Sequence, residues 1–187
     1  MRKLKLQMQM SLDGYVAGPN GEMDWMSWGW GDDIKAYVKE LNAPIDTIIM
    51  GRKLAEGFIR HWAAAVQTPE GNDEFSRKMV DTPKVVFSKT LTESAWDNAT
   101  VATGDLVEEI KKLKAANGGD IITYGGAGFA SSLIKAGLVD EYYLFVNPAA
   151  IGNGMPIFKL LDSKLGLKLV QAHPFEVGIV ALKYVPA

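Results

Sequence analysis

One segment of the chain alternates strand, turn, helix and strand, and this order restricts the fold. An apolar run begins at Ile121 and leads into a glycine-rich turn at Gly125 to Gly128. A helical pattern follows over Phe129 to Lys135, and a second apolar run follows over Glu141 to Val146. Strands that are joined through a helix run in the same direction, because a parallel connection needs a crossover of this length. The segment therefore predicts a strand, helix and strand of a parallel sheet.

Similar patterns alternate through the first three quarters of the chain, whereas the last part predicts strands only. Leu165 to His173 and Val177 to Tyr184 surround Pro174 and predict an antiparallel hairpin. The expected fold is α/β, with about eight strands in a mostly parallel sheet and helices on both faces. We expect one domain over residues 1–187. The other expected strands cover residues 4–10, 47–50, 84–87 and 100–102, and the other expected helices cover 32–41, 53–62, 72–80 and 106–116.

Two local patterns refine these expectations. Apolar side chains at positions 4, 6, 8 and 10 alternate with lysine or glutamine at positions 3, 5, 7 and 9. This period of two predicts that the first strand has one buried face. Asp105 and Glu108 have the spacing of a capping box, which predicts the start of the helix over 106–116.

The composition excludes several classes of protein. The 187 residues are 48% hydrophobic, which is enough for a sizeable core. Twenty basic and 22 acidic residues give a net charge of -2, so we expect no binding to nucleic acid or to an anionic membrane. The chain has no cysteine and only two histidines, so we expect no metal site and no disulfide. No signal peptide or membrane-length apolar run is present, which indicates a soluble, cytoplasmic protein.

Three expected strand ends carry residues suited to a dinucleotide cofactor. They are Gly51-Arg52-Lys53, Ser88-Lys89-Thr90 and Gly125-Gly126-Ala127-Gly128. Ligands of parallel sheets bind at the carboxyl ends of the strands, where a helix start favours phosphate. Each segment alone is equally typical of a surface turn, but their recurrence predicts a phosphorylated cofactor. The three cations could surround a ribose 2′-phosphate, which favours NADP over NAD.

The segments together carry a family resemblance that covers nearly the whole chain. In order, they are SLDGYVAGPNG from Ser11, the turn Met50-Gly51-Arg52, the pair Ser88-Lys89, YGGAG and GLVDEYYLFVNPAAIGNGMPIF. The chain resembles the dihydrofolate reductase-like superfamily. It is most similar there to the RibD C-terminal-like reductase domain of bifunctional riboflavin-biosynthesis proteins and to its stand-alone bacterial relatives.

The resemblance implies a dihydrofolate reductase-like fold that binds NADPH and often forms a homodimer. It places a loop beside the nicotinamide at Ala17 and Gly18. The cofactor contacts that it implies are Gly51, Arg52, Lys53, Ser88, Lys89, Gly125, Gly126, Ala127 and Gly128.

The substrate is expected between the loop from Asp13 to Gly31 and the helix that begins near Asp32, with Gly152 to Pro156 closing the far side. Three tryptophans in that loop could stack on a flat heteroaromatic ring, although a tryptophan is more often a packing residue. They are Trp25, Trp28 and Trp30.

Two aspartates are candidate catalytic residues. Asp33, with Asp32 beside it, resembles in position the acid of dihydrofolate reductases and could orient or protonate a ring nitrogen after hydride transfer. A helix start favours its ionised form, however, so capping is the alternative role. Asp13 stands where the family has a functionally sensitive acid, and its alternative role is to end the first strand in an Asx-turn.

The predicted function is NADPH-dependent reduction of a small pterin- or pyrimidine-like heterocycle, as by 5-amino-6-(5-phosphoribosylamino)uracil reductase or dihydrofolate reductase. No zinc deaminase motif is present. The loop from Asp13 to Gly31 holds Glu22 and Asp24 but no lysine or arginine, which argues against a phosphorylated pyrimidine. The extra residues WMSWGWG argue against efficient dihydrofolate reduction. The alternative is a dimeric NADP-binding protein without turnover.

Overall fold

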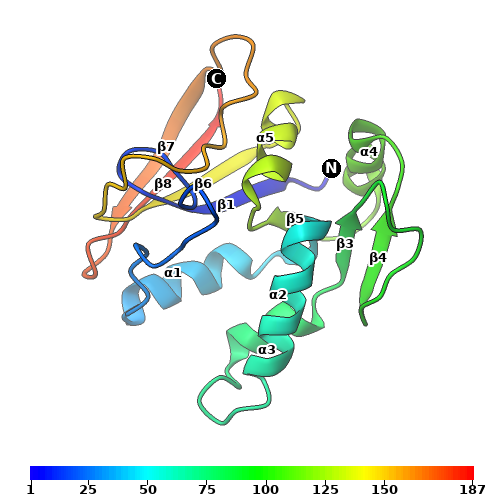
Figure 1. Ribbon diagram of the computed structural model, residues 1–187, viewed down its shortest axis with the longest axis horizontal. Coiled ribbons are helices and arrows are strands. Elements are labelled where there is room, and N and C mark those ends of the chain that lie inside the picture. The colour runs from blue at the N-terminus through cyan, green and yellow to red at the C-terminus, as the bar shows by residue number, and fades with distance from the viewer.

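Eight strands form one sheet in the order β4-β3-β2-β5-β1-β6-β8-β7 in the computed structural model, which describes residues 1–187 (Figure 1). The strands are β1 (Leu4–Met10), β2 (Ile45–Gly51), β3 (Lys84–Phe87), β4 (Ala99–Ala102), β5 (Asp120–Thr123), β6 (Glu141–Val146), β7 (Leu167–Pro174) and β8 (Val180–Pro186). The helices are α1 (Asp32–Asn42), α2 (Arg52–Ala65), α3 (Glu74–Asp81), α4 (Leu106–Ala115) and α5 (Ala127–Lys135).

The sheet has the mixed topology that the sequence predicts. Strands β1 to β6 pair in parallel, while β8 is antiparallel to both β6 and β7. The expected α/β fold, with its mostly parallel sheet and antiparallel C-terminal hairpin, is therefore confirmed. None of the five helices combines the length and the apolar character that crossing a bilayer would require.

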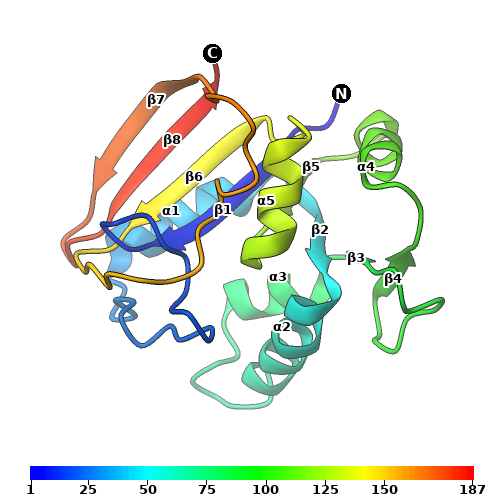
Figure 2. The ribbon, with the colours of Figure 1, turned by 45° about the horizontal axis from the view of Figure 1, so that its top comes forward.

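Helices cover both faces of the sheet (Figure 2). On one face, α5 contributes Ala130 and Leu133, and α4 contributes Ile110, to a cluster of 16 buried residues that includes the apolar side chains of β1. On the other face, Ile34 of α1 belongs to a second cluster beside β6 and β8, and Met79 of α3 belongs to a third beside β2 and β3. In the views of Figures 1 and 2, α1 and α5 lie on opposite sides of β1.

The prediction that β1 has one buried face is wrong. Six of its seven residues are buried, and the exception, Gln9, is intermediate. The cause is the position of β1 in the middle of the sheet, between β5 and β6, where helices cover both of its faces. Lys5 and Gln7 therefore lie in the interior, only 6% and 7% exposed.

Two local predictions need smaller corrections. Helix α5 begins at Ala127, so Ala127 and Gly128 belong to its first turn and not to the loop before it. At the start of α4, the side chain of Asp105 accepts hydrogen bonds from the backbone N–H groups of Val107 and Glu108. Glu108 does not complete the predicted capping box, because its carboxylate accepts from Lys111 at 3.0 Å instead.

A buried acid holds the amino end of β6. Burial raises the pKa of Glu141, but hydrogen bonds from Lys3 at 2.7 Å and Tyr143 at 2.8 Å, with the nearby charge of Lys183, outweigh this effect. The net result lowers the pKa of Glu141 from 4.5 to about 2. A carboxylate held in this way stabilises the ionised folded state.

We expect Glu141→Gln to lower the free energy of unfolding by about 2 kcal/mol at neutral pH. Because the pKa of Glu141 is lower in the folded state, its contribution is complete above the ordinary value of 4.5 and is lost as the pH falls toward about 2. Urea unfolding of both proteins across this range measures the difference. A difference that stays constant from neutral to acid conditions would contradict the assignment.

Candidate cofactor and substrate site

The three predicted cofactor segments meet at the carboxyl edge of the sheet. Strands β3, β2 and β5 are neighbours in that order, and β1 follows β5. Gly51 ends β2, Ser88 follows β3, and Gly125 comes two residues after β5 ends. The loop that follows β1 therefore begins beside the same edge. The topology thus places side by side segments that lie up to 77 residues apart along the chain, from Gly51 to Gly128.

Two of the helices that start at this edge, α2 and α5, leave their first N–H groups without a side-chain acceptor. Gly51 precedes α2 and Gly126 precedes α5, and neither helix has a side-chain cap or an acid in its first turn. In contrast, Asp73 and Asp105 cap α3 and α4 with their carboxylates. Free N–H groups and a positive dipole end suit phosphate oxygens, so these two helix starts fit a pyrophosphate.

Glycines give the turn after β5 its backbone conformation and leave its outer side uncovered. Gly125 has a φ of +129°, a conformation that side chains rarely allow, and its peptide bond to Gly126 is cis. A Cβ atom added at Gly126 or Gly128 would meet nothing within 4 Å, so the outer side of this turn is open. An open backbone surface of this kind allows the close approach of a phosphorylated ligand.

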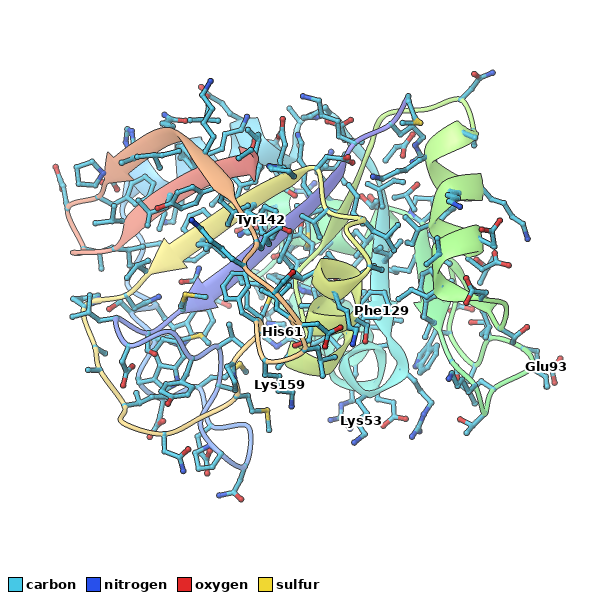
Figure 3. The ribbon with its side chains drawn as sticks, turned by 90° about the horizontal axis from the view of Figure 1, so that it is seen from above. Lys53, His61, Glu93, Phe129, Tyr142 and Lys159 are labelled. Carbon is cyan, nitrogen blue, oxygen red and sulfur yellow. The ribbon has the colours of Figure 1, made fainter.

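The three predicted cations at this edge differ in whether they form an ion pair. Arg52 pairs with Glu56 at 2.7 Å, and both side chains are exposed, so the pair contributes little and can give way to an anion. Lys53 and Lys89 have no ion-pair partner among the salt bridges of the structure, and Lys53 points outward from the start of α2 (Figure 3). The three residues supply positive charge beside the uncapped helix starts.

Ser88 has a structural role in the turn after β3. Its hydroxyl oxygen accepts from the backbone N–H groups of Thr90, at 3.1 Å, and Leu91, at 2.9 Å. The hydroxyl is thus engaged in holding the loop that presents Lys89. A direct contact between the Ser88 side chain and a cofactor stays a prediction.

Asp13 connects the loop after β1 to the loop after β6. Its carboxylate accepts from Ser11 Oγ at 2.6 Å and from the backbone N–H groups of Gly152, at 2.6 Å, and Ile151. These hydrogen bonds, that of Ser11 first, lower the pKa of Asp13. The observed role is therefore to fix two loops against each other, beyond the Asx-turn considered as its alternative. A catalytic role for Asp13 stays a prediction.

Ala17 and Gly18 belong to the pair of loops that Asp13 holds together. The carbonyl oxygen of Ala17 accepts from the backbone N–H of Met155 at 2.8 Å. Gly154 packs so closely that an added Cβ would collide with the Ala17 oxygen. A depression of about 360 Å³ opens beside this contact and is lined by Gly18, Pro19, Glu22, Asp24, Trp25, Ile151 and Asn153.

The three tryptophans have different surroundings. Trp25 lines the depression and donates its indole N–H to the carbonyl of Glu22 at 3.2 Å. Trp30 packs against the cluster around α1, as expected for a packing residue. Trp28 is 60% exposed and stacks on Trp30 with ring centroids 6.4 Å apart. Trp25 is therefore the tryptophan best placed to contact a ligand in the depression.

Asp33 is engaged at both carboxylate oxygens. It accepts from the backbone N–H of Glu176 at 2.9 Å and from that of Ile34 at 2.7 Å. These two hydrogen bonds lower the pKa of Asp33 and favour its ionised form, and a catalytic role for Asp33 stays a prediction. The observed contacts join the start of α1 to the β7–β8 turn. Asp32 is exposed.

A buried amide pair escaped the sequence analysis. Asn147, directly after β6, is fully buried and donates from Nδ2 to Gln9 Oε1 at 2.7 Å. Its Oδ1 accepts from the backbone N–H of Ser27 at 2.9 Å, which joins the loop from Asp13 to Gly31, the tryptophan loop, to the sheet. The available signal was the repeated glutamine of β1, which the period-two interpretation placed on the face that is not buried.

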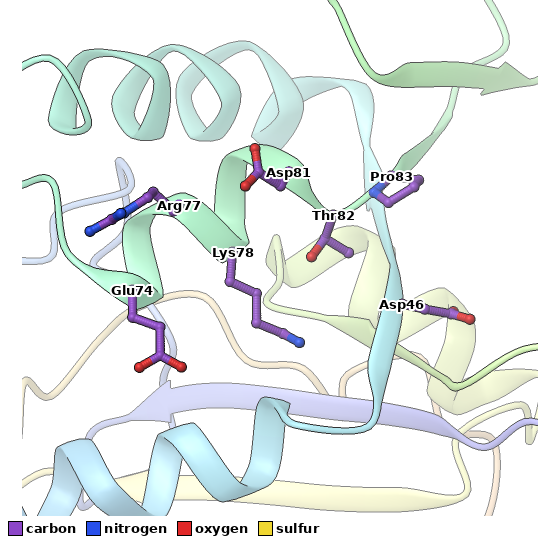
Figure 4. A pocket seen from close by; sticks show the side chains of 7 residues that line it. All are labelled: Asp46, Glu74, Arg77, Lys78, Asp81, Thr82 and Pro83. Atoms are coloured by element: carbon purple, nitrogen blue, oxygen red, sulfur yellow. The ribbon is translucent and has the colours of Figure 1, made fainter.

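A larger depression lies elsewhere and lacks these features. It measures about 550 Å³ and is lined by Asp46, Glu74, Arg77, Lys78, Asp81, Thr82 and Pro83 (Figure 4). Asp46 is the second residue of β2, whereas Gly51 is the last, so this depression is at the amino edge of the sheet. Volume alone does not identify the site, because the uncapped helix starts are at the opposite edge.

Comparison with known proteins agrees with the fold and the order of the segments. The family model of the RibD C-terminal domain matches residues 2–181. The uncharacterized protein YyaP of Bacillus subtilis strain 168 is 34% identical over 187 residues, which cover 98% of this chain and 94% of YyaP.

Two solved structures share the fold at low identity. A protein from Shewanella sp. PV-4 that is named for riboflavin biosynthesis aligns with a TM-score of 0.74 and 22% identity, over 100% of this chain and 99% of that one. A diaminohydroxyphosphoribosylaminopyrimidine deaminase/5-amino-6-(5-phosphoribosylamino)uracil reductase from Thermotoga maritima aligns with a TM-score of 0.71 and 17% identity. The alignment covers 100% of this chain and 57% of the Thermotoga chain.

Proposed function

Because the chain belongs to the RibD C-terminal domain family, we propose that it is an NADPH-dependent reductase of a small pterin- or pyrimidine-like heterocycle. The observation that carries this proposal is the meeting of two uncapped helix starts and three cations at one sheet edge, beside the loops held by Asp13. Bound NADPH would supply the hydride, and the residues of the chain would position the reactants.

The cofactor would bind along the edge formed by β3, β2 and β5. The N–H groups that follow Gly51 and Gly126 would hold the pyrophosphate, since no side chain competes for them. Arg52, Lys53 and Lys89 would surround the ribose 2′-phosphate. Ala17 and Gly18 would lie beside the nicotinamide, in the loop whose position Asp13 holds.

The residues around the depression would orient the heterocycle and exclude water. Trp25 offers a flat face to the ring. Two backbone hydrogen bonds favour the ionised form of Asp33, so we assign it to fixing α1 rather than to donating the proton. The proton that follows the hydride would then come from water. Alignment of the ring against the nicotinamide is the main contribution of the protein.

The 2′-phosphate assignment predicts a loss of cofactor discrimination. We expect Arg52→Ala combined with Lys89→Ala to weaken NADPH binding by about tenfold or more and to affect NADH binding much less, because only NADPH carries the extra phosphate. Titration of tryptophan fluorescence with each cofactor measures both affinities. Lys111→Ala combined with Lys112→Ala on α4 is the control, since it removes the same charge from exposed side chains outside the three cofactor segments. Equal weakening of NADPH and NADH would refute the assignment.

A binding protein without turnover is the second candidate function. Two features favour it. The cofactor edge, which is the carboxyl edge of β3, β2 and β5, has several groups suited to NADPH, whereas Asp13 and Asp33, the two catalytic candidates, are engaged in structural hydrogen bonds. Following the near-ultraviolet absorbance of NADPH with pterins and flavin precursors separates the two functions. Oxidation with any of these compounds supports the reductase, and tight binding of NADPH without oxidation by any of them supports the binding protein.

Homodimerisation and a cytoplasmic location are further parts of the proposal. The edge strand β7 exposes Leu169 at 49% and Val170 at 53%, which would suit a second copy of the chain at the sheet edge. Analytical ultracentrifugation of the purified protein tests the dimer.

A further inference from the structure

Glu22 is a charged residue of the depression beside Ala17, and its carboxylate is held in a defined place. The backbone N–H of Asn20 donates to Glu22 Oε2 at 2.9 Å, and Asn20 Nδ2 donates to Oε1 at 2.7 Å. These hydrogen bonds, that of the Asn20 side chain first, lower the pKa of Glu22 and favour its ionised form. A negative charge is therefore fixed in the lining of the depression.

The backbone around Glu22 places this charge against Gly18. The carbonyl of Glu22 accepts from the backbone N–H of Gly18 at 2.8 Å and from the indole N–H of Trp25 at 3.2 Å. A Cβ atom added at Gly18 would collide with Glu22 Oε2. The carboxylate thus lies directly over the glycine, and a side chain at position 18 would displace it.

The surroundings of Glu22 favour a positively charged ligand. Asp24 also lines the depression, and its lining contains no lysine or arginine. Glu22 takes part in none of the salt bridges of the structure. The face of Trp25 lines the same space, and an indole ring attracts cations. A cationic ring in the depression would therefore be held more tightly than a neutral ring of the same shape.

The order of the strands gives the proposed cofactor a direction along the edge. Lys89, after β3, and Arg52, after β2, are assigned to the 2′-phosphate, and the helix starts after β2 and β5 are assigned to the pyrophosphate. The pyrophosphate of NADPH lies between its two nucleosides. Because the strands follow in the order β3-β2-β5-β1, the nicotinamide end extends past β5 toward the loop that follows β1.

Packing brings that loop to the face of the sheet that α5 covers. Val16 of the loop and Ile157 of the segment after β6 are buried in the same cluster as Ala130 and Leu133 of α5. The start of α5 and the loops after β1 and β6 also lie at the same end of the sheet (Figure 2). Gly18 comes two residues after Val16, so the depression is where the nicotinamide end of the cofactor arrives.

We propose that Glu22 is a further catalytic residue of the reductase, whose carboxylate faces the nicotinamide ring and stabilises the positive charge that the ring gains when it gives up a hydride. Asn20 is the positioning residue that holds this carboxylate. The inference rests on the proposed reductase function. It assigns to the depression a preference for the oxidised, cationic ring over the reduced, neutral ring.

The charge changes during hydride transfer explain why such a group accelerates the reaction. The step breaks a C–H bond at C4 of the reduced nicotinamide and forms a C–H bond on the substrate with the same electron pair. The substrate is reduced and takes up a proton from water, and the nicotinamide is oxidised from a neutral to a cationic ring. A carboxylate fixed beside the ring before the step stabilises the charge as it develops.

The test compares the two oxidation states of the cofactor, which differ in charge at the nicotinamide ring. We expect Glu22→Gln to weaken the binding of NADP⁺ about fivefold and to leave the binding of NADPH nearly unchanged, because only the oxidised ring is a cation. Isothermal titration calorimetry of the wild-type protein and the variant with each cofactor measures the ratio of the two affinities. A purely structural role for Glu22 would change both affinities by the same factor.

Two control variants remove one negative charge elsewhere. Asp24→Asn removes the other acid of the depression and should change the ratio less, because the carboxylate over Gly18 stays in place. Glu70→Gln removes an exposed acid between α2 and α3 and should leave the ratio unaltered. An effect of either control as large as that of Glu22→Gln would overturn the assignment.

The titrations also separate failure of this inference from failure of the proposed function. If the wild-type protein binds neither cofactor at millimolar concentration, the proposed reductase is wrong. If NADPH binds, the role of Glu22 is wrong in either of two cases. In the first, NADP⁺ does not bind the wild-type protein, and in the second, Glu22→Gln leaves the ratio of the two affinities unchanged.

Discussion

Replacing Arg2 with methionine should lower the free energy of unfolding by about 2–3 kcal/mol, because it removes the buried donor of several hydrogen bonds, while the side chain of its ion-pair partner Asp46 is 44% exposed and stays hydrated. Arg2 is only 9% exposed. Its guanidinium donates to the carbonyl of Gly119 at 2.6 Å, to Thr47 Oγ1 at 2.6 Å and to the carboxylate of Asp46. One side chain thus joins the start of β1 to the start of β2 and to the segment before β5. Methionine fills a similar volume but leaves these acceptors without a donor.

An exposed ion pair provides the matched control for Arg2. Lys39 contacts Glu74 at 2.7 Å, but the two side chains are 69% and 76% exposed. We expect Lys39→Met to change the unfolding free energy by at most about 0.5 kcal/mol, because surface pairs contribute little. Urea denaturation of both variants measures the difference. Similar destabilisation by the two replacements would show that burial of the guanidinium is not the source of its contribution.

The fold was predictable because its main signals are local. Alternating apolar runs identify strands, and glycine or aspartate before a helical pattern identifies helix starts, as Asp105 does for α4. The order of the strands is different, because it depends on how crossovers pack and no local pattern encodes it. The position of β5 between β2 and β1 is such a feature. It places β1 in the interior of the sheet, where helices cover both of its faces, and for that reason the one-face prediction for β1 failed.

The candidate site was predictable in part for the same reason. Glycines and cations after strands mark the cofactor edge, because ligands bind where parallel strands end. The contacts of the two aspartates were not predictable. Asp33 bonds to Glu176 and Asp13 bonds to Gly152, and each pair is separated by about 140 residues, as the sequence separations of 143 and 139 show. Only the folded arrangement reveals that both carboxylates accept backbone N–H groups.

Replacing Gly125 with alanine should weaken NADPH binding about 100-fold and lower the unfolding free energy by about 1–3 kcal/mol. The φ of +129° at this residue is strained for any side chain, so the turn must change shape to accept the new Cβ. The cost lies in the backbone and not in the space, because the added atom would lie 3.4 Å from the sulfur of Met8, an ordinary van der Waals contact. A changed turn moves the N–H groups at the start of α5, which we assign to the pyrophosphate.

The replacement of Gly128 is the control that distinguishes the effect of a strained backbone conformation from the effect of losing any glycine. It lies in the first turn of α5, and an added Cβ there meets nothing within 4 Å. Gly128→Ala should therefore leave the unfolding free energy unchanged or raise it by about 0.5–1 kcal/mol, since alanine favours a helix. Thermal unfolding and NADPH titration of both variants give the comparison. If Gly125→Ala binds NADPH as the wild-type protein does, the turn after β5 does not hold the cofactor and the pyrophosphate must lie elsewhere on the edge.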